Sequence, residues 1–159
     1  MREEIRQIAG EIGTFSNTWK VLIFDEDIET IVRHAEPFEA QGFEVHKCVS
    51  IESAMRCIER EEFDIAVVDQ GSAAFEGRRV IRHLVRYNSP VPLIVLARSL
   101  DDQCCRQALE LGATEYLEKP VSTAKVNRII QEFFEPKSIA ATETAMKSIL
   151  KFLWQDQKA

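Results

Sequence analysis

The sequence contains no apolar stretch long enough to cross a bilayer. Met1 is followed by Arg2, Glu3 and Glu4 and then by scattered apolar residues, so the start of the chain also lacks the apolar core of a signal peptide. We therefore expect a cytoplasmic protein with no membrane partner.

The cysteines are not arranged as metal-binding pairs. The four cysteines include no C-x-x-C pair, and the three histidines are scattered along the chain. A structural zinc site built from such residues needs ligands that converge at short spacings. We therefore expect free thiols and no structural metal site of this kind.

Basic residues are too few to give the chain a positive surface. The net charge is -6, and binding to nucleic acid depends on neutralising its phosphates, so we expect no nucleic acid partner. Arg79, Arg82 and Arg86 share one predicted helical face. Such a stripe is usually solvated, and if this one binds a partner we expect an acidic protein surface.

An alternation of short apolar runs and longer helical patterns dominates the middle of the chain. It predicts one α/β domain over residues 19–135, with a doubly wound, largely parallel sheet and helices on both faces. Pro37 lies inside the first helical stretch and should kink or break it. The predicted strands are 21–24, 43–47, 65–68, 93–96 and 115–117, and the predicted helices are 28–41, 51–61, 78–87, 101–111 and one that Ser122 opens.

Two segments lie outside this domain. Residues 1–18 and 136–159 carry apolar residues at helical spacing and are predicted to be N- and C-terminal amphipathic helices. Short helices need a surface for their apolar face. Two alternatives stay open: the helices pack back on the domain, or they mediate docking or a homodimer.

Charged residues follow three of the predicted strands directly. Asp25 and Glu26 end the first strand, Asp69 ends the third, and Lys119 ends the fifth. Because ligands bind at the carboxyl ends of parallel strands, we expect these side chains to meet. Gathered carboxylates repel one another unless a cation such as Mg²⁺ joins them, and Asp69 is then placed to attack a phosphoryl group. The alternative is that the acidic residues merely cap the first helix. A solvent-facing position is expected for His34.

Several motifs resemble those of a known family. They are V-L-I-F-D-E-D at 21–27, F-D-I-A-V-V-D at 63–69, Gly77, P-L-I-V-L-A at 92–97 and G-A-T-E-Y-L-E-K-P at 112–120. In order and spacing they resemble the response-regulator receiver domain of two-component signalling. The resemblance implies a flavodoxin-like fold with a five-stranded parallel sheet of order 2-1-3-4-5.

The resemblance also implies roles for individual residues. Asp69 corresponds to the residue that accepts a phosphoryl group, and a sensor histidine kinase supplies that group. Asp25 and Glu26 correspond to the acidic pair that holds Mg²⁺, together with Asp69 and the backbone carbonyl of Gly71. Lys119 corresponds to the lysine of the K-P motif, whose bond to proline is often cis.

Two positions depart from the family pattern, and both concern switching. Tyr116 corresponds to the aromatic switch residue, but Ala97 stands where the family has a Thr or Ser hydroxyl that couples the phosphoryl group to it. The loop after Asp69 has Ser72-Ala73 in place of Met-Pro and is expected to be more mobile than usual.

The resulting hypothesis is a stand-alone receiver in a phosphorelay, phosphorylated on Asp69 with Mg²⁺, that signals by changing its binding to an unknown downstream protein. The alternative is a constitutive interaction module that keeps the fold but does not switch. We do not expect an enzyme; a phosphatase that uses Asp69 as nucleophile is a third possibility.

Overall fold

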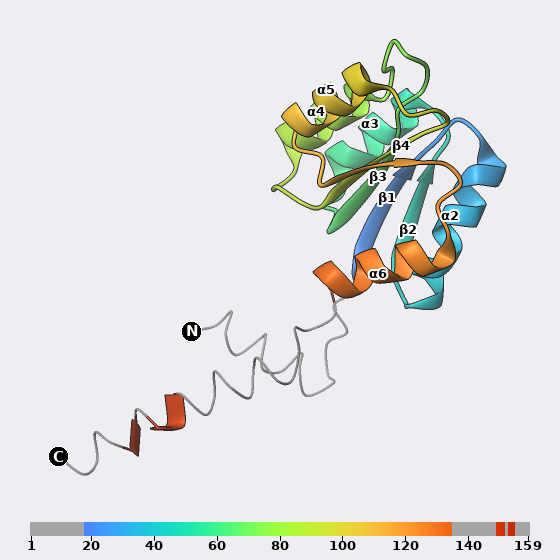
Figure 1. The fold of residues 1–159 in the computed structure, drawn as a ribbon. Helices are drawn as coiled ribbons and strands as arrows, with labels where there is room; N and C mark the ends of the chain where they lie inside the picture. The colour runs from blue at the N-terminus through green and yellow to red at the C-terminus, as the bar shows by residue number, and fades with distance from the viewer. Residues whose placement is uncertain (1–17, 135–148, 152, 155–159) are drawn as a thin grey trace.

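The computed structural model describes residues 18–134, 149–151 and 153–154. Five strands alternate with five main helices (Figure 1). The strands are β1 (Lys20–Phe24), β2 (Glu44–Cys48), β3 (Ile65–Asp69), β4 (Leu93–Ala97) and β5 (Glu115–Glu118). The helices are α2 (Ile28–Ala40), α3 (Ile51–Arg60), α4 (Arg78–Tyr87), α5 (Asp102–Glu110) and α6 (Thr123–Phe133).

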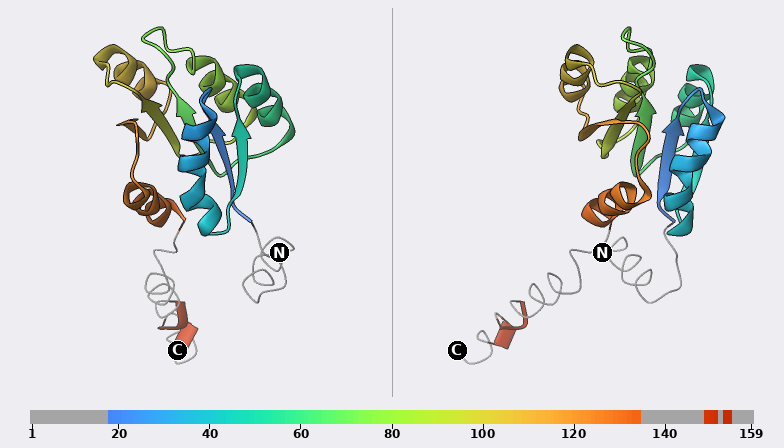
Figure 2. Two further views of the ribbon diagram at one scale, coloured as in Figure 1. Left: turned by 90° about the vertical axis from the view of Figure 1, so that its right-hand side faces the viewer. Right: turned by 45° about the vertical axis from the view of Figure 1, so that its right-hand side comes forward.

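The strands form one parallel sheet in the order β2-β1-β3-β4-β5, as predicted. Helices cover both faces of this sheet, with α3, α4 and α5 on one side and α2 and α6 on the other (Figures 1 and 2). The order reverses between β1 and β3, so the carboxyl ends of these two neighbouring strands form the switch point at which doubly wound folds bind ligands.

Alternate residues of the buried strands face two separate apolar cores. In β1, Leu22 and Phe24 pack under α3, α4 and α5, whereas Val21 and Ile23 pack under α2 and α6. Strands buried on both faces read as continuous apolar runs, which explains why the sequence marks β1, β3 and β4 so clearly. The edge strand β2 begins and ends one residue later than predicted.

Polar side chains fix the starts of the helices. Ser50 and Ser122 accept hydrogen bonds from the backbone amides of Ser53 and Lys125, which fits the predicted starts of α3 and α6. Of the two outcomes predicted at Pro37, the break is wrong, because α2 runs as one element to Ala40, and the kink stays a prediction. Phe38, in the turn that follows Pro37, is buried and packs edge-on against Phe43, at 5.4 Å between ring centroids, and this contact anchors the last turn.

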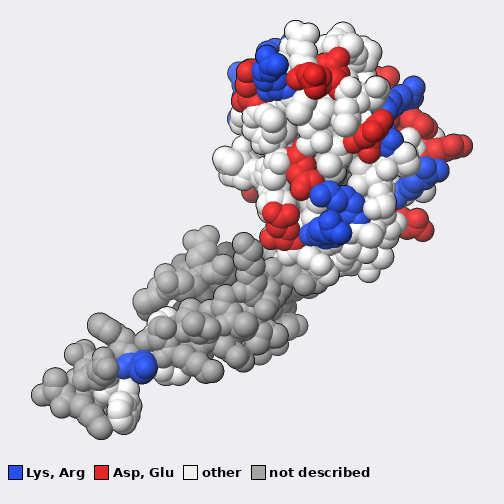
Figure 3. Space-filling model, viewed as in Figure 1, with Lys and Arg blue, Asp and Glu red and all other residues white. Residues whose placement is uncertain are grey.

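Most of the two predicted terminal helices lies outside the described residues, and so do their proposed contacts. Within the ranges that the structure describes, no helix is long and apolar enough to span a membrane. The arginines of the α4 stripe, Arg79, Arg82 and Arg86, are exposed as expected. Acidic and basic side chains are interspersed on the face that Figure 3 shows.

Candidate functional site

The centre of the site is an ammonium group between two carboxylates. Lys119 follows β5, and its Nζ lies 2.5 Å from Oδ2 of Asp25 after β1 and 2.7 Å from Oδ1 of Asp69 at the end of β3. All three side chains are largely buried, with exposed fractions of 10%, 4% and 13% respectively. Residues distant in sequence are thus brought together at the carboxyl edge of the sheet, as predicted.

The capping alternative applies to one acidic residue only. Asp27 caps α2, because its carboxylate accepts hydrogen bonds from the Glu29 backbone amide and the Thr30 hydroxyl. The hydrogen bond from Thr30 is the main cause that holds the pKa of Asp27 below its ordinary value. Asp25 instead accepts the backbone N–H of Asp27 with Oδ1 and binds Lys119 with Oδ2. The Asp25 carboxylate therefore points into the site.

An open cleft of about 620 Å³ lies beside this group. Asp25, Glu26, Asp69 and Gly71, the four residues predicted to hold a metal, all line it. The exposed Arg98 also lines the cleft, and sequence reasoning missed it. Its position one residue after β4, at the same sheet edge, was the available signal.

The loop from Gln70 to Gly77 closes one side of the cleft. Gly71 has a positive φ of 84°, which glycine adopts without strain. At Gly77, a Cβ atom would lie 1.9 Å from the carbonyl oxygen of Asp69, so only glycine allows α4 to begin this close to the end of β3. These two glycines shape the backbone around the end of β3.

Hydrogen bonds tie this loop to the start of α4. The backbone amide of Ser72 donates to Oε2 of Glu76 at 2.7 Å, and the Ser72 hydroxyl donates to the other oxygen. The hydroxyl bond is the main cause of a lowered pKa at Glu76. The expected mobility of the loop stays a prediction, but these contacts argue against it.

Tyr116 is joined to the residue that follows Asp69. Its hydroxyl donates to Oε1 of Gln70 and accepts the backbone N–H of Asp101 at 3.2 Å. Gln70 is 4% exposed, and its amide nitrogen donates to the Ser72 carbonyl. Burial raises the pKa of Tyr116, so the phenol stays protonated and can donate. Sequence reasoning missed Gln70, because a loop residue carries no periodic signal.

The structure also shows the surroundings of the remaining predicted positions. Ala97, at the end of β4, is fully buried, and its carbonyl accepts the backbone N–H of Lys119 at 2.8 Å. The bond between Lys119 and Pro120 is cis. The expectation that His34 faces solvent is wrong: it is 3% exposed, and its Nε2 accepts the backbone N–H of Val121 at 3.3 Å. Burial, followed by the nearby Lys119 charge, lowers the pKa of His34.

The cysteines are free, as expected. Burial raises the pKa of the Cys48 thiol to about 12 and also raises the pKa of Cys57 and Cys104. These thiols are therefore protonated near neutral pH and poor nucleophiles.

Comparison with known proteins identifies the family to which this chain belongs. The family model for the response regulator receiver domain matches residues 21–131, which include all four strand ends of the site. This chain belongs to the response regulator receiver domain family. Receiver domains are signalling modules of two-component systems rather than classical enzymes, and they are phosphorylated by histidine kinases.

Curated relatives of this receiver domain are themselves response regulators. It is 26% identical over 129 residues to the alkaline phosphatase synthesis transcriptional regulatory protein PhoP of Bacillus subtilis, which covers 81% of this chain and 54% of that protein. It is 32% identical over 127 residues to the regulatory protein VirG of Rhizobium rhizogenes, which covers 77% of this chain and 52% of that protein. The chain thus spans about half the length of these relatives.

Solved structures share the fold of this receiver domain. A CheY-like receiver domain protein from Methanospirillum hungatei superposes with a TM-score of 0.67 at 22% identity, over 73% of this chain and 93% of that one. A response regulator protein from Burkholderia pseudomallei superposes with a TM-score of 0.64 at 21% identity, over 82% of this chain and 74% of that one. The structure of the latter holds a phosphorylated aspartic acid, a calcium ion and citrate.

Proposed function

We propose that this receiver domain accepts a phosphoryl group on Asp69 from a histidine kinase, with Mg²⁺ as cofactor. One observation carries the proposal: Lys119 lies between Asp25 and Asp69, beside an open cleft at the switch point of the sheet. A structural ion pair would need no cleft, whereas a phosphoryl acceptor needs both access and a nearby positive charge.

The residues around the cleft fit a divalent cation. Asp25, Glu26 and Asp69 offer carboxylate oxygens, and Gly71 offers a backbone carbonyl, which are the hard ligands that Mg²⁺ takes. Glu26 is exposed, so it can reach a cation without losing a partner in the core. When bound, the cation would neutralise charge on the oxygens of the incoming phosphoryl group.

The chemistry on Asp69 follows from its contacts. One carboxylate oxygen, Oδ1, is held by Lys119, so the second oxygen is left to attack phosphorus. An O–P bond forms as the bond from phosphorus to the donor breaks, and the donor leaves with that electron pair. A phosphohistidine whose other ring nitrogen carries a proton leaves as neutral imidazole. Lys119 then pairs with the negative charge that the transferred group brings. The product is an acyl phosphate on Asp69.

The contact between Gln70 and Tyr116 offers a route from Asp69 to the surface. Ala97 supplies no hydroxyl, but Gln70 is the neighbour of Asp69 in the chain, and it holds Tyr116 against the start of α5. A movement of the loop after phosphorylation would change this contact and present a different surface to a downstream protein. We propose Tyr116 as the switch residue on this basis.

Two expectations stay predictions. One is a dimer contact through the terminal helices, and the other is a cytoplasmic location. Neither the family match nor the relatives support a constitutive interaction module.

Intact-mass spectrometry tests the proposed function. The full chain is incubated with a small acyl phosphate donor and Mg²⁺, next to Asp69→Asn and a chelated sample. The proposal expects one phosphoryl adduct that needs both Asp69 and the cation. An adduct of equal yield on Asp69→Asn, or none on a folded native chain, would contradict it.

A further inference from the structure

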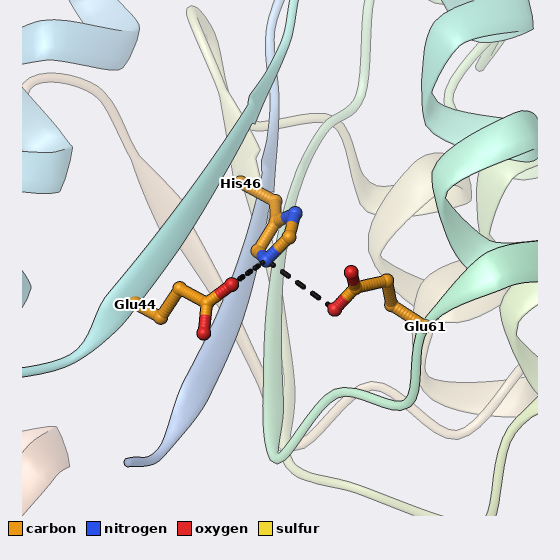
Figure 4. Close-up of side chains that lie close together, drawn as sticks. All are labelled: Glu44, His46 and Glu61. Atoms are coloured by element: carbon orange, nitrogen blue, oxygen red, sulfur yellow. Dashed lines mark hydrogen bonds and ion pairs between the residues drawn. The ribbon is translucent and has the colours of Figure 1, made fainter.

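A second group of potential metal ligands lies at the opposite edge of the domain from β5, on the outer strand β2. Glu44 and His46 are two residues apart on this strand, so both point to the same side of the sheet. Glu61, the C-cap residue that follows α3, approaches the same imidazole (Figure 4). This histidine-glutamate cluster, Glu44, His46 and Glu61, is separate from the carboxylates around Asp69.

The spacing within the histidine-glutamate cluster suits one ion. Nε2 of His46 lies 2.9 Å from Oε1 of Glu44 and 3.6 Å from Oε2 of Glu61, and all three atoms lie within 4.8 Å of one another. Ligands about 2.0–2.1 Å from a tetrahedral zinc ion lie roughly 3.3 Å apart. The distances of 2.9 and 3.6 Å bracket that value, so small rotations of the flexible glutamate side chains would complete the geometry.

The imidazole of His46 is held in the orientation that a metal needs. Its Nδ1 lies 3.4 Å from Sγ of Cys57, and the ring packs edge-on against Phe63, with centroids 5.2 Å apart. Without metal, Nε2 donates its proton to Glu44, because a carboxylate can only accept. An ion at Nε2 would replace that proton, and Nδ1 would then carry the ring hydrogen and face the Cys57 sulfur, which is a weak acceptor. Nε2 is the nitrogen that faces the two carboxylates.

One competing cation is already present. Nζ of Lys20 lies 2.8 Å from Oε2 of Glu61, and this hydrogen bond is the first cause of a lowered pKa at Glu61. Lys20 and Glu61 are about one third exposed, at 35% and 33%, so an ion from solvent can reach the carboxylate and displace the ammonium. The cluster therefore already attracts positive charge.

We propose that Glu44, His46 and Glu61 bind a first-row divalent metal ion, with Zn²⁺ as the preferred ion. A nitrogen ligand favours zinc over Mg²⁺ and Ca²⁺, which take oxygen ligands. Three protein ligands leave a fourth position for water or for a group from another molecule. The ion would tie the edge strand β2 to the end of α3. This site does not depend on phosphorylation of Asp69.

The test is a titration of the full chain with Zn²⁺, in which binding is measured by calorimetry and stability by the thermal midpoint of unfolding. Excess Mg²⁺ is present to occupy the cleft at Asp69. The native chain is compared with His46→Gln and with the matched control His83→Gln. His83 lies 3.0 Å from Glu59, and among the described residues this pair has no third side chain within reach of the same ion. Circular dichroism checks that each variant folds.

The proposal expects at least about tenfold weaker Zn²⁺ binding and no thermal shift for His46→Gln, with native behaviour for His83→Gln. Lys20→Met should bind Zn²⁺ more tightly, because the competing ammonium is gone. Cobalt(II) in place of zinc should give the visible absorption of a four-coordinate site, and His46→Gln should abolish it. A native chain that binds no Zn²⁺, or equal losses in the two histidine variants, would overturn the proposal.

Discussion

Replacing Tyr116 by phenylalanine removes one hydroxyl and leaves the ring. The variant loses the hydrogen bond to Oε1 of Gln70, in a side chain that is 4% exposed. The lost bond and the buried acceptor left without a partner together cost roughly 2 kcal/mol. The amide of Asp101 is less buried and can turn to water, so it adds little.

This loss should be visible in thermal and urea unfolding. With an unfolding entropy of about 2 cal/mol/K per residue, a domain of this size loses about 8 °C in Tm for 2 kcal/mol. The matched control is Tyr87→Phe, because Tyr87 is 48% exposed and its variant should stay within about 0.5 kcal/mol of the native chain.

A double-mutant cycle with Gln70→Met isolates the contact. Once the buried amide is gone, Tyr116→Phe should cost roughly 1 kcal/mol less than it does in the native chain. The contact contributes nothing, and the proposed route from Gln70 to Tyr116 fails, if Tyr116→Phe is as stable as the Tyr87 control or if the two changes simply add.

Three further predictions concern the site. Gly77→Ala should destabilise the domain by about 1–3 kcal/mol, because its Cβ would meet the carbonyl oxygen of Asp69 at 1.9 Å. Urea unfolding should show a larger loss of stability for this variant than for Gly112→Ala. At Gly112 φ is positive, but the added Cβ meets no neighbour within 4 Å. Lys119→Met should slow adduct formation on Asp69 by about a hundredfold, measured by time-resolved intact mass, and an unchanged rate would remove Lys119 from the mechanism. Burial lowers the pKa of His34 below 6.5, so the unfolded chain binds the proton more readily and stability should fall as pH drops below that value. Urea unfolding between about pH 5 and 7 should show a flatter dependence for His34→Gln, and parallel curves would contradict this.

Much of the fold is readable from the sequence because its strands are buried on both faces. Continuous apolar runs mark β1, β3 and β4, and each is followed by a charged or polar residue at the edge where the site forms. Parallel connectivity then brings Asp25, Asp69 and Lys119 together without any further information. The site's main group was predictable for this reason.

The parts that sequence reasoning missed depend on tertiary contacts. His34 lies on the same face of α2 as the buried Ile31, Ala35 and Phe38. This periodicity indicates a buried position, whereas the polarity of the imidazole favours an exposed one. Its acceptor nitrogen is satisfied by a loop 87 residues away. Gln70 meets Tyr116 across 46 residues, which no local pattern can reveal.

The histidine-glutamate cluster shows the same limit. Short spacings of cysteine and histidine indicate metal sites in a sequence, whereas Glu61 reaches His46 only because α3 ends beside β2. The relevant ligands are carboxylates, which are common on any surface, so sequence alone gives them no weight.

Site-resolved mass spectrometry tests the central claim most directly. The native chain is treated with an acyl phosphate donor and Mg²⁺, reduced with borohydride, digested and sequenced. An acyl phosphate on Asp69 should be reduced to homoserine at position 69, and omission of the donor or of Mg²⁺ should leave aspartate there. Homoserine at another position, or unmodified Asp69 in a chain that carries a phosphoryl adduct, would contradict the assignment of Asp69 as the acceptor.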